Sequence, residues 1–413
     1  MLALQSLRSS WIQLDLNAHP IRICQNCHLA VSVTPVETGH NAYCPRCNTQ
    51  LYRGGNSSLS GNLALAITCL ALFIPCFGYN YLHINLFGME LYASFPLGIE
   101  ALLDENYLLL ALLVLFCGFI APLLVCLSVL SAHYALAKRR FKLLDLSLHL
   151  IHTLKHWVMV DVFLVSVAIA CFKLRDYADI FISPPLYGLL LLQFLTVTLL
   201  SRISVRRYWE NWQSEASYNF THKEIHCSHC HLSQPLQSTC VRCKKPVINE
   251  NYASVQKTWS YLLAAAICFI PANWLSISIL MSNGQRLEDT IFSGVVSLIN
   301  SGMVGIGVII FVASILVPAI KIIGLGYLLF SIHFKQSTFL RQRMIIYFIL
   351  KWIGKWSMID LFVISIMLTL VDRGQVLDFT PGYGAIAFGF VVVFTMLATD
   401  SFDPKSIWEH QQN

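Results

Sequence analysis

Eight of the fourteen cysteines in this 413-residue chain lie in four Cys-x-x-Cys motifs. The motifs come in two pairs, and in each pair a short segment separates the two motifs. Four thiolates carried by two such turns make the tetrahedral sulfur site that zinc prefers. The sequence therefore predicts two small zinc ribbons. One zinc ion would be held by Cys24, Cys27, Cys44 and Cys47, and the other by Cys227, Cys230, Cys240 and Cys243.

Other chemistry at these motifs has less support. Thioredoxin-like thiol exchange is typical of a single motif in a βαβ context, which the sequence does not suggest. A rubredoxin-like iron centre remains an alternative, and His28, His229 and His231 lie beside the ligands as substitutes. A four-cysteine site leaves no position for water, so we expect structural metals, with the ribbons forming a rigid platform at the foot of each four-span unit. Six further cysteines are interpreted as packing residues: Cys69, Cys76, Cys117, Cys126, Cys171 and Cys268.

The elements around the ribbons must be membrane helices. The chain is 56% hydrophobic and only 12% charged, about half the charge of a soluble domain. This composition excludes a soluble enzyme, a secreted disulfide scaffold and a disordered chain. Apolar runs near 20 residues predict an all-α polytopic membrane protein. We expect eight spans, at about 60–80, 107–131, 156–174, 184–203, 259–281, 302–330, 345–370 and 381–399.

The distribution of Lys and Arg predicts the orientation. The segment 81–105 has neither residue, whereas the next connection contains Lys138, Arg139, Arg140 and Lys142. The positive-inside rule then places both termini and both ribbons in the cytoplasm. The net charge of +6 is not gathered on one face, so no nucleic-acid partner is expected. The N-terminus has no apolar core or cleavage site of a signal peptide.

The two halves of the chain repeat each other. Phe-Ile-Pro at 73–75 recurs at 269–271, and Trp-Val-Met-Val-Asp-Val-Phe at 157–163 recurs as Trp-Ser-Met-Ile-Asp-Leu-Phe at 356–362. Each half would hold one ribbon and four spans, and an even number of spans makes the repeats parallel. The predicted domains are a ribbon (1–58), a four-helix unit (59–205), a second ribbon (206–257), a second four-helix unit (258–403) and a tail (404–413).

Ionisable residues at membrane depth are candidate functional residues, because each costs several kcal/mol unless it is paired or hydrated. Lys321 lies three residues after Pro318, and the matching residue of the first half is Val125. The fold therefore does not demand this charge, although a lysine that snorkels to the interface is the alternative. Asp161 and Asp360 follow a Trp and a basic residue, which favours interfacial carboxylates that pair with lysine or cap a helix.

Further polar candidates lie elsewhere in the spans. Lys173 and Asp176 share a helix face at the outer end of the third span and can neutralise each other. Ser314, Ser357 and Thr395 are hydroxyls that could converge on Lys321.

Two outer segments, 87–104 and 286–302, are amphipathic. Each is expected to form a short interfacial helix or a re-entrant connector. The sequence contains no GxxxxGK[ST], HExxH or GxSxG motif, so we expect neither a nucleotide site nor an enzyme.

Several motifs together resemble those of a known family. They are AYCPRC, ASILVP-x-x-K, SIHFK, WSMIDLFVIS and EDTIFSG. The chain resembles the paraquat-inducible protein A family, most of all its LetA/YebS branch. This resemblance implies a Gram-negative inner-membrane protein that loads or unloads phospholipid on a periplasm-spanning, LetB-like tunnel of MCE domains. It also implies a central polar network at Lys173, Asp176, Ser314, Lys321, Ser357 and Thr395.

The sequence is therefore interpreted as a non-enzymatic lipid-transport subunit. Lys321 would meet a phosphate headgroup or relay a proton in an amphipathic cavity of the second unit, and Asp176 would neutralise it. The alternatives are a proton-coupled small-molecule exporter or channel and a metal-responsive membrane scaffold.

Overall fold

The protein is mostly helical. The computed structural model describes residues 21–408 except 38, 55–58, 87–88, 175–178, 214–223, 236, 248–250, 283–284, 301, 337 and 372–376. Within this part, six helices are long and apolar enough to cross a membrane. They are Leu59–Gly78, Leu108–Ala137, Pro184–Arg202, Val304–His333, Leu340–Thr369 and Tyr383–Ser401.

These six helices correspond to six of the eight predicted spans. The predicted spans 156–174 and 259–281 correspond to α7 (Val160–Leu174) and α10 (Asn251–Trp274), which are not among the six. The predicted end of span 259–281 is wrong, because the helix ends at Trp274 and a strand follows. The number of membrane crossings in each half therefore remains a prediction.

The order of elements in the first half is repeated in the second. The first half has α2 (Leu59–Gly78), β5 (Leu82–Leu86), β6 (Met89–Ala93), α3 (Phe95–Asp104), α4 (Leu108–Leu115), η1 (Phe116–Ile120), α5 (Ala121–Ala137), α6 (Phe141–Leu154), α7, β7 (Asp179–Ile182) and α8 (Pro184–Arg202). The second has α10, β10 (Ser278–Ser282), β11 (Gln285–Asp289), α11 (Ile291–Asn300), α12 (Val304–Phe311), η2 (Val312–Leu316), α13 (Val317–His333), α14 (Leu340–Ile353), η3 (Gly354–Met358), α15 (Ile359–Val371), β12 (Leu377–Pro381) and α16 (Tyr383–Ser401). Helix α9 (Val205–Trp212) follows α8, and η4 (Pro404–Ile407) follows α16.

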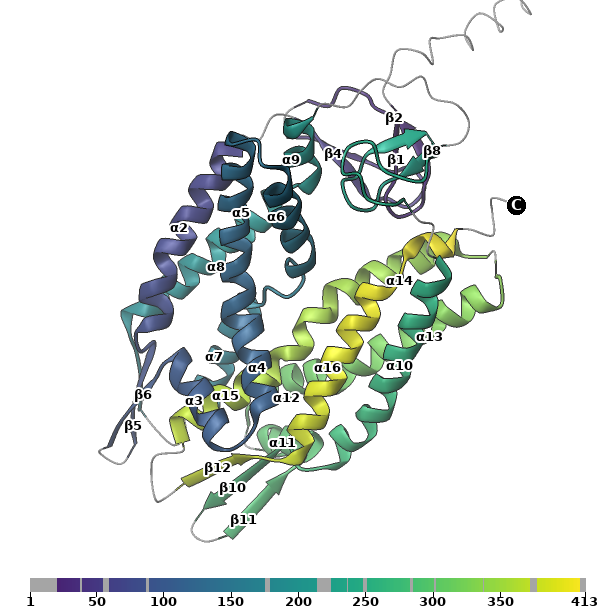
Figure 1. Cartoon of the computed structure of the whole chain (residues 1–413). Coiled ribbons are helices and arrows are strands. Elements are labelled where there is room, and N and C mark those ends of the chain that lie inside the picture. The colour runs from purple at the N-terminus through teal and green to yellow at the C-terminus, as the bar shows by residue number, and fades with distance from the viewer. Residues whose placement is uncertain are drawn as a thin grey trace, which may run out of the picture.

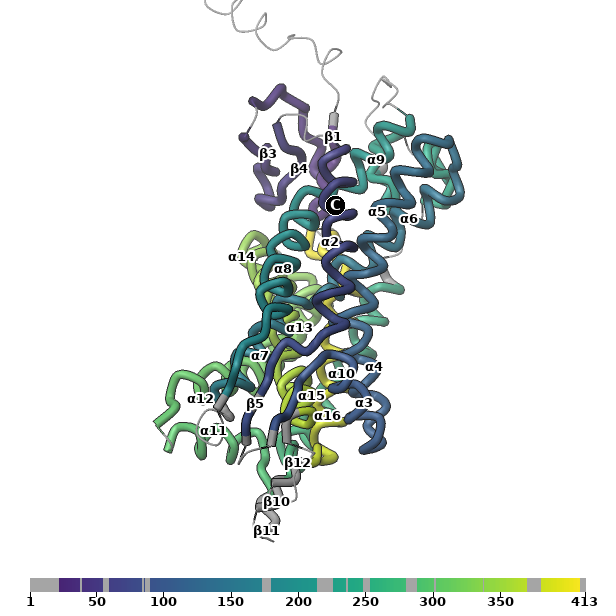
Figure 2. Tube along the Cα trace, turned by 90° about the vertical axis from the view of Figure 1, so that its left-hand side faces the viewer, coloured from purple at the N-terminus to yellow at the C-terminus, as the bar shows by residue number. Residues whose placement is uncertain are grey.

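Each half carries a small antiparallel sheet, so the all-α prediction is wrong at one end of the molecule. β5 pairs with β6 and β7, and β10 pairs with β11 and β12. Both sheets lie at the end opposite the ribbons, as Figures 1 and 2 show. The third strand of each sheet comes from a distant connection, and short segments of this kind have little periodicity of their own.

The amphipathic outer segments form the short helices α3 and α11, each directly after a strand. Ser94 begins α3 as its N-cap, and its hydroxyl accepts a hydrogen bond from the backbone N–H of Leu97 at 3.4 Å. The strand preceding each helix takes up the first part of the predicted segment.

A π-helical turn interrupts the second long helix of each half. The turns η1 and η2 end directly before α5 and α13, which carry Pro122 and Pro318 in their first turns. A proline has no N–H for the carbonyl four residues earlier, which belongs to Gly118 or Ser314. Such turns widen the helix and are frequent at functional sites.

The halves are joined mainly through their third helices. The Ser166 hydroxyl of α7 donates to the Ile359 carbonyl at 3.0 Å, and the Ser365 hydroxyl of α15 donates to the Gly98 carbonyl of α3 at 3.3 Å. A Cβ on Gly98 would lie 2.9 Å from the Ser365 hydroxyl oxygen, so α3 and α15 approach too closely for any side chain there.

Candidate functional site

The four Cys-x-x-Cys turns share one local backbone geometry. In the first turn, the Cys24 N–H donates to the Leu29 carbonyl at 2.9 Å, and the His28 N–H donates to the Cys24 carbonyl at 3.0 Å. The same two hydrogen bonds recur in the other three turns. In each turn the residue after the second cysteine has a positive φ of 55° to 58°. These residues are His28, Asn48, His231 and Lys244. A left-handed residue closes each turn and brings both thiols to one side.

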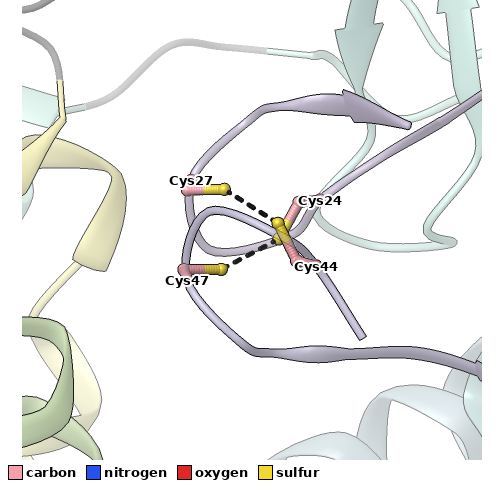
Figure 3. Close-up of side chains that lie close together, drawn as sticks. All are labelled: Cys24, Cys27, Cys44 and Cys47. Atoms are coloured by element: carbon pink, nitrogen blue, oxygen red, sulfur yellow. Dashed lines mark hydrogen bonds between the residues drawn. The ribbon is translucent and has the colours of Figure 1, made fainter. Parts of the chain in front are cut away.

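The turns bring the eight cysteines together in two buried groups, which confirms their predicted grouping. Figure 3 shows the first group, Cys24, Cys27, Cys44 and Cys47. All four sulfur atoms of a group lie within 4.8 Å of one another. Sulfur pairs across the turns are 3.4 to 3.6 Å apart. Zinc ligands at about 2.3 Å in a tetrahedron would lie about 3.8 Å from each other. Both groups therefore fit a tetrahedral metal ion after a small expansion.

The nearby histidines are outside these sulfur groups among the described residues. His28 and His231 close the turns; His28 faces the second ribbon, and His231 faces His226 of its own ribbon and His152 of α6. The His231 Nδ1 and His226 Nε2 atoms are 3.3 Å apart, and the ring of His28 lies 6.3 Å from that of His226. These side chains therefore help the two ribbons to pack together rather than replace a cysteine ligand.

The two ribbons also contact each other through backbone. The first contains β1 (Ile21–Ile23), β2 (Ala30–Ser32), β3 (Asn41–Tyr43) and β4 (Gln50–Arg53), and the second contains β8 (Glu224–His226) and β9 (Ser233–Pro235). The Ile23 N–H donates to the Ser233 hydroxyl at 3.1 Å. Figure 1 shows both ribbons together above the second half.

Each ribbon rests on the half that it does not precede in the sequence. On the second ribbon, Lys245 Nζ and His229 Nε2 lie 3.2 Å and 3.5 Å from the carboxylate oxygens of Asp145 in α6. On the first ribbon, the Arg46 guanidinium stacks 4.3 Å from the ring of Trp408, beyond α16. Contacts with α6 and with the C-terminal residues therefore decide the place of each ribbon, and each half has one ribbon at its foot.

The second half contains a fully buried cation. Lys321 of α13 has no exposed surface, and its Nζ donates to the Thr395 hydroxyl of α16 at 2.9 Å. The Thr395 hydroxyl in turn donates to the Val392 carbonyl at 3.0 Å. A Cβ on Gly354 would lie 3.6 Å from the lysine Nζ, so the backbone of η3 lies beside the charge.

Two more of the predicted hydroxyls lie near this lysine. The Ser357 hydroxyl donates to the Gly354 carbonyl at 3.0 Å, in the turn that contacts Lys321. Ser314 is fully buried in η2, two helical turns before Lys321 on the same face, and its hydroxyl has no hydrogen-bond partner among the described residues. The structure thus gathers Ser314, Lys321, Ser357 and Thr395 at the junction of η2, α13, η3 and α16.

The remaining predicted residues lie elsewhere or cannot be placed. Asp176 and the side chain of Lys173 lie outside the described residues, so their pairing and their relation to Lys321 stay predictions. Asp161 and Asp360 lie in the first turns of α7 and α15, where a negative charge favours the helix dipole. The neighbouring Lys355 donates from Nζ to the Val158 carbonyl at 3.3 Å.

Sequence reasoning missed one carboxylate. Asp400, in the last turn of α16, interacts electrostatically with Lys321 and with Lys351 of α14. It lies just beyond the predicted span 381–399 and was therefore not considered. Its place in the last turn of the helix that carries Thr395 was the available signal.

An apolar cavity of about 740 Å³ lies in the first half. The amphipathic cavity that the sequence predicts in the second half is a different site. Phenylalanines of α2, α3 and η1 line it, among them Phe73, Phe77, Phe95 and Phe119. Glu100 is the charged residue at its edge.

Comparisons with known proteins agree with the resemblance seen in the motifs. The family model described as "Paraquat-inducible protein A" matches residues 59–213 and 255–412. The chain is 36% identical to the Escherichia coli K12 "Lipophilic envelope-spanning tunnel protein A", over 94% of this chain and 91% of that protein. It is 32% identical to a Haemophilus influenzae "Probable intermembrane transport protein", over 95% and 97%. The E. coli K12 "Intermembrane transport protein PqiA" is 27% identical over 94% and 95%. No solved structure matches the chain.

Proposed function

The chain belongs to the paraquat-inducible protein A family, and from this premise we propose that it is a bacterial inner-membrane subunit of a phospholipid transport system. Its relatives are named for an envelope-spanning tunnel and for intermembrane transport. The partner would be a periplasmic, LetB-like tunnel protein of MCE domains, on which this subunit loads or unloads phospholipid. Both termini and both ribbons would lie in the cytoplasm, with four membrane helices in each half. The subunit itself would not be an enzyme.

The buried contact between Lys321 and Thr395 is the observation that carries this proposal. An ammonium group has three N–H donors, and among the described residues one acceptor is within hydrogen-bond distance. A cation buried at this depth is stable only where an anion, a carboxylate or water reaches it. The phosphate of a lipid headgroup supplies a negative charge and several acceptor oxygens.

The surrounding hydroxyls support the same role. The unpartnered Ser314 hydroxyl can donate to a phosphate held by Lys321, and the Ser357 hydroxyl can do so when it turns away from the Gly354 carbonyl. The widened turn η2 frees backbone groups beside this position. In the proposed cycle, Lys321 binds the headgroup while the acyl chains remain in the apolar surroundings.

We test this function by reconstituting the full chain with labelled phospholipid, with and without its tunnel partner. Transfer should require this chain and should be lost in Lys321→Met. Lys257→Met is the matched control, because Lys257 is an exposed lysine on α10 whose removal should leave transfer unchanged. Transfer at the wild-type rate with Lys321→Met at normal abundance would refute the assigned role of this site.

Zinc is the metal proposed for both sulfur groups. Four buried thiolates with these spacings match a closed tetrahedral zinc site, in which ligation by four cysteines contributes folding energy and leaves no open position. The ions would hold the ribbons rigid so that they can brace both halves of the membrane part.

A further inference from the structure

Positively charged side chains from three parts of the molecule gather where the halves meet. Lys155 lies in the bend between α6 and α7, and Lys351 lies in the last turn of α14. Lys355 lies in η3, and Arg53 ends strand β4 of the first ribbon. The hydrogen bond from Lys355 Nζ to the Val158 carbonyl, at 3.3 Å, shows that η3 lies directly against the bend of the first half.

These charges act on one another. Lys155 is half-buried, and burial lowers its pKa. The charges of Lys355, Lys351 and Arg53 lower the pKa of Lys155 further. Asp400 acts on Lys351 and offsets part of this charge. The lowered pKa of Lys155 shows that positive charge is concentrated in this group.

The fold does not demand these lysines. At the spacing of the repeats, Lys351 and Lys355 of the second half match His152 and His156 of the first. Histidines thus fill the same places in the matching bend. Lysines in the open would be hydrated and would repel one another little, whereas half-buried lysines at an interface repel strongly unless an anion joins them.

The position along the membrane axis matches a lipid headgroup. Trp352 and Trp356 lie on the same turns as the two lysines of the second half, with 71% and 39% of their surface exposed. Exposed tryptophans are typical of the headgroup level of a bilayer. The lysines next to them therefore lie at the depth at which lipid phosphates are found.

We propose that Arg53, Lys155, Lys351 and Lys355, the ribbon-side basic cluster, bind the phosphate of an anionic phospholipid headgroup in the leaflet on the ribbon side. The bound phosphate joins the first ribbon to both halves. Because this inference does not use Lys321 or the transport cycle, it stands or fails separately from the proposed function.

The experiment measures thermal unfolding of the full chain, purified in dodecyl maltoside, during titration with dioleoyl-phosphatidylglycerol. The zwitterionic dioleoyl-phosphatidylcholine is the reference lipid. Stabilisation by phosphatidylglycerol should require at least about tenfold more lipid in the variant K155Q/K351Q/K355Q, since each lysine near an anionic lipid contributes roughly a factor of five to binding. The variant K155R/K351R/K355R should retain the stabilisation, which shows that charge rather than folding is measured.

The control variant K138Q/K142Q/K335Q removes the same charge from exposed lysines at the ribbon side and should bind as the wild type does. The proposal is overturned if this control weakens binding equally, or if both lipids stabilise the chain equally. Inorganic phosphate is tested as a competitor. If it stabilises the chain alone and displaces phosphatidylglycerol, the anion site is upheld but the lipid assignment is overturned.

Discussion

The two halves place different chemistry at matching positions of one framework. In the second half, Lys321 and Ser357 lie beside each other around Gly354. In the first half, the matching residues Val125 and Val158 belong to one buried apolar cluster. The same helices can therefore be packed with valine alone. The lysine is an addition that costs stability, and such costs are usually retained for function.

The π-helical turns differ in the same way. In η1, the Cys117 carbonyl accepts a hydrogen bond from the Met159 N–H at 3.3 Å, and Gly118 packs against Phe95. In η2, the residue that matches Gly118 is Ser314, whose hydroxyl has no hydrogen-bond partner in the described part of the chain. In η1, neighbouring residues of the protein occupy the space and the hydrogen-bonding group. In η2, the Ser314 hydroxyl remains available to a ligand.

Placing a lysine in the first half should have the largest effect. Val125→Lys buries a charge in an apolar cluster and should cost roughly 3 kcal/mol or more, so that little folded protein accumulates. Abundance in the membrane fraction and thermal unfolding in detergent measure this loss. Val125→Met is the control and should accumulate normally. Normal abundance of Val125→Lys would mean that both halves accept a cation and would remove the contrast between them.

Removing the natural lysine should leave the fold intact. Lys321→Met relieves the cost of a buried charge, so the protein should accumulate at least as well as the wild type. Phospholipid transfer should fall roughly 10–150-fold, the value of a charged hydrogen bond. Lys321→Arg should be partly active if the residue binds a headgroup and inactive if it relays a proton, because arginine does not deprotonate. Transfer and expression are measured side by side.

Loss of one cysteine group at a time tests whether each ribbon rests on the half that it does not precede in the sequence. Elemental analysis should find about two zinc ions per chain. Cys27→Ser should lose one of them and raise hydrogen exchange in η4 and α14 of the second half, on which the first ribbon rests. Cys240→Ser should instead raise exchange in α6. Each substitution should lower abundance more than specific activity. The reverse pattern of exchange would contradict the observed placement.

The smallest effects are expected at the matching threonines. Thr395→Val removes the hydrogen-bond acceptor of Lys321 and should cost about 1–3 kcal/mol. Thr196→Val in the first half removes a bond to the Leu192 carbonyl of its own helix and a weak contact with the Cys69 thiol, and should cost about 1 kcal/mol or less. Chemical denaturation of both variants in detergent measures the difference. Equal costs would indicate that the lysine contact adds nothing to stability.

The spacing of the Cys-x-x-Cys motifs in the sequence was sufficient to predict the two groups of cysteines. Each Cys-x-x-Cys turn closes through hydrogen bonds within six residues, so the pattern of types already determines where the thiols point. The apolar runs likewise predicted most spans, because helix length and hydrophobicity are properties of a continuous segment. The internal repeat alone identified Val125 as the residue of the first half at the position that matches Lys321.

Other features depended on contacts between distant segments. The sequence suggested that the Thr395 hydroxyl could reach Lys321, but it could not show the contact, and it missed the electrostatic interaction of Asp400 with Lys321. The third strand of each sheet, the exchanged ribbons and the ribbon-side basic cluster each join residues far apart in the chain. By itself the sequence determined the grouping of the eight cysteines, the internal repeat and most of the spans, since these follow from local patterns. The tertiary structure alone decided which half each ribbon braces and which charges meet, because such pairings depend on how the helices pack.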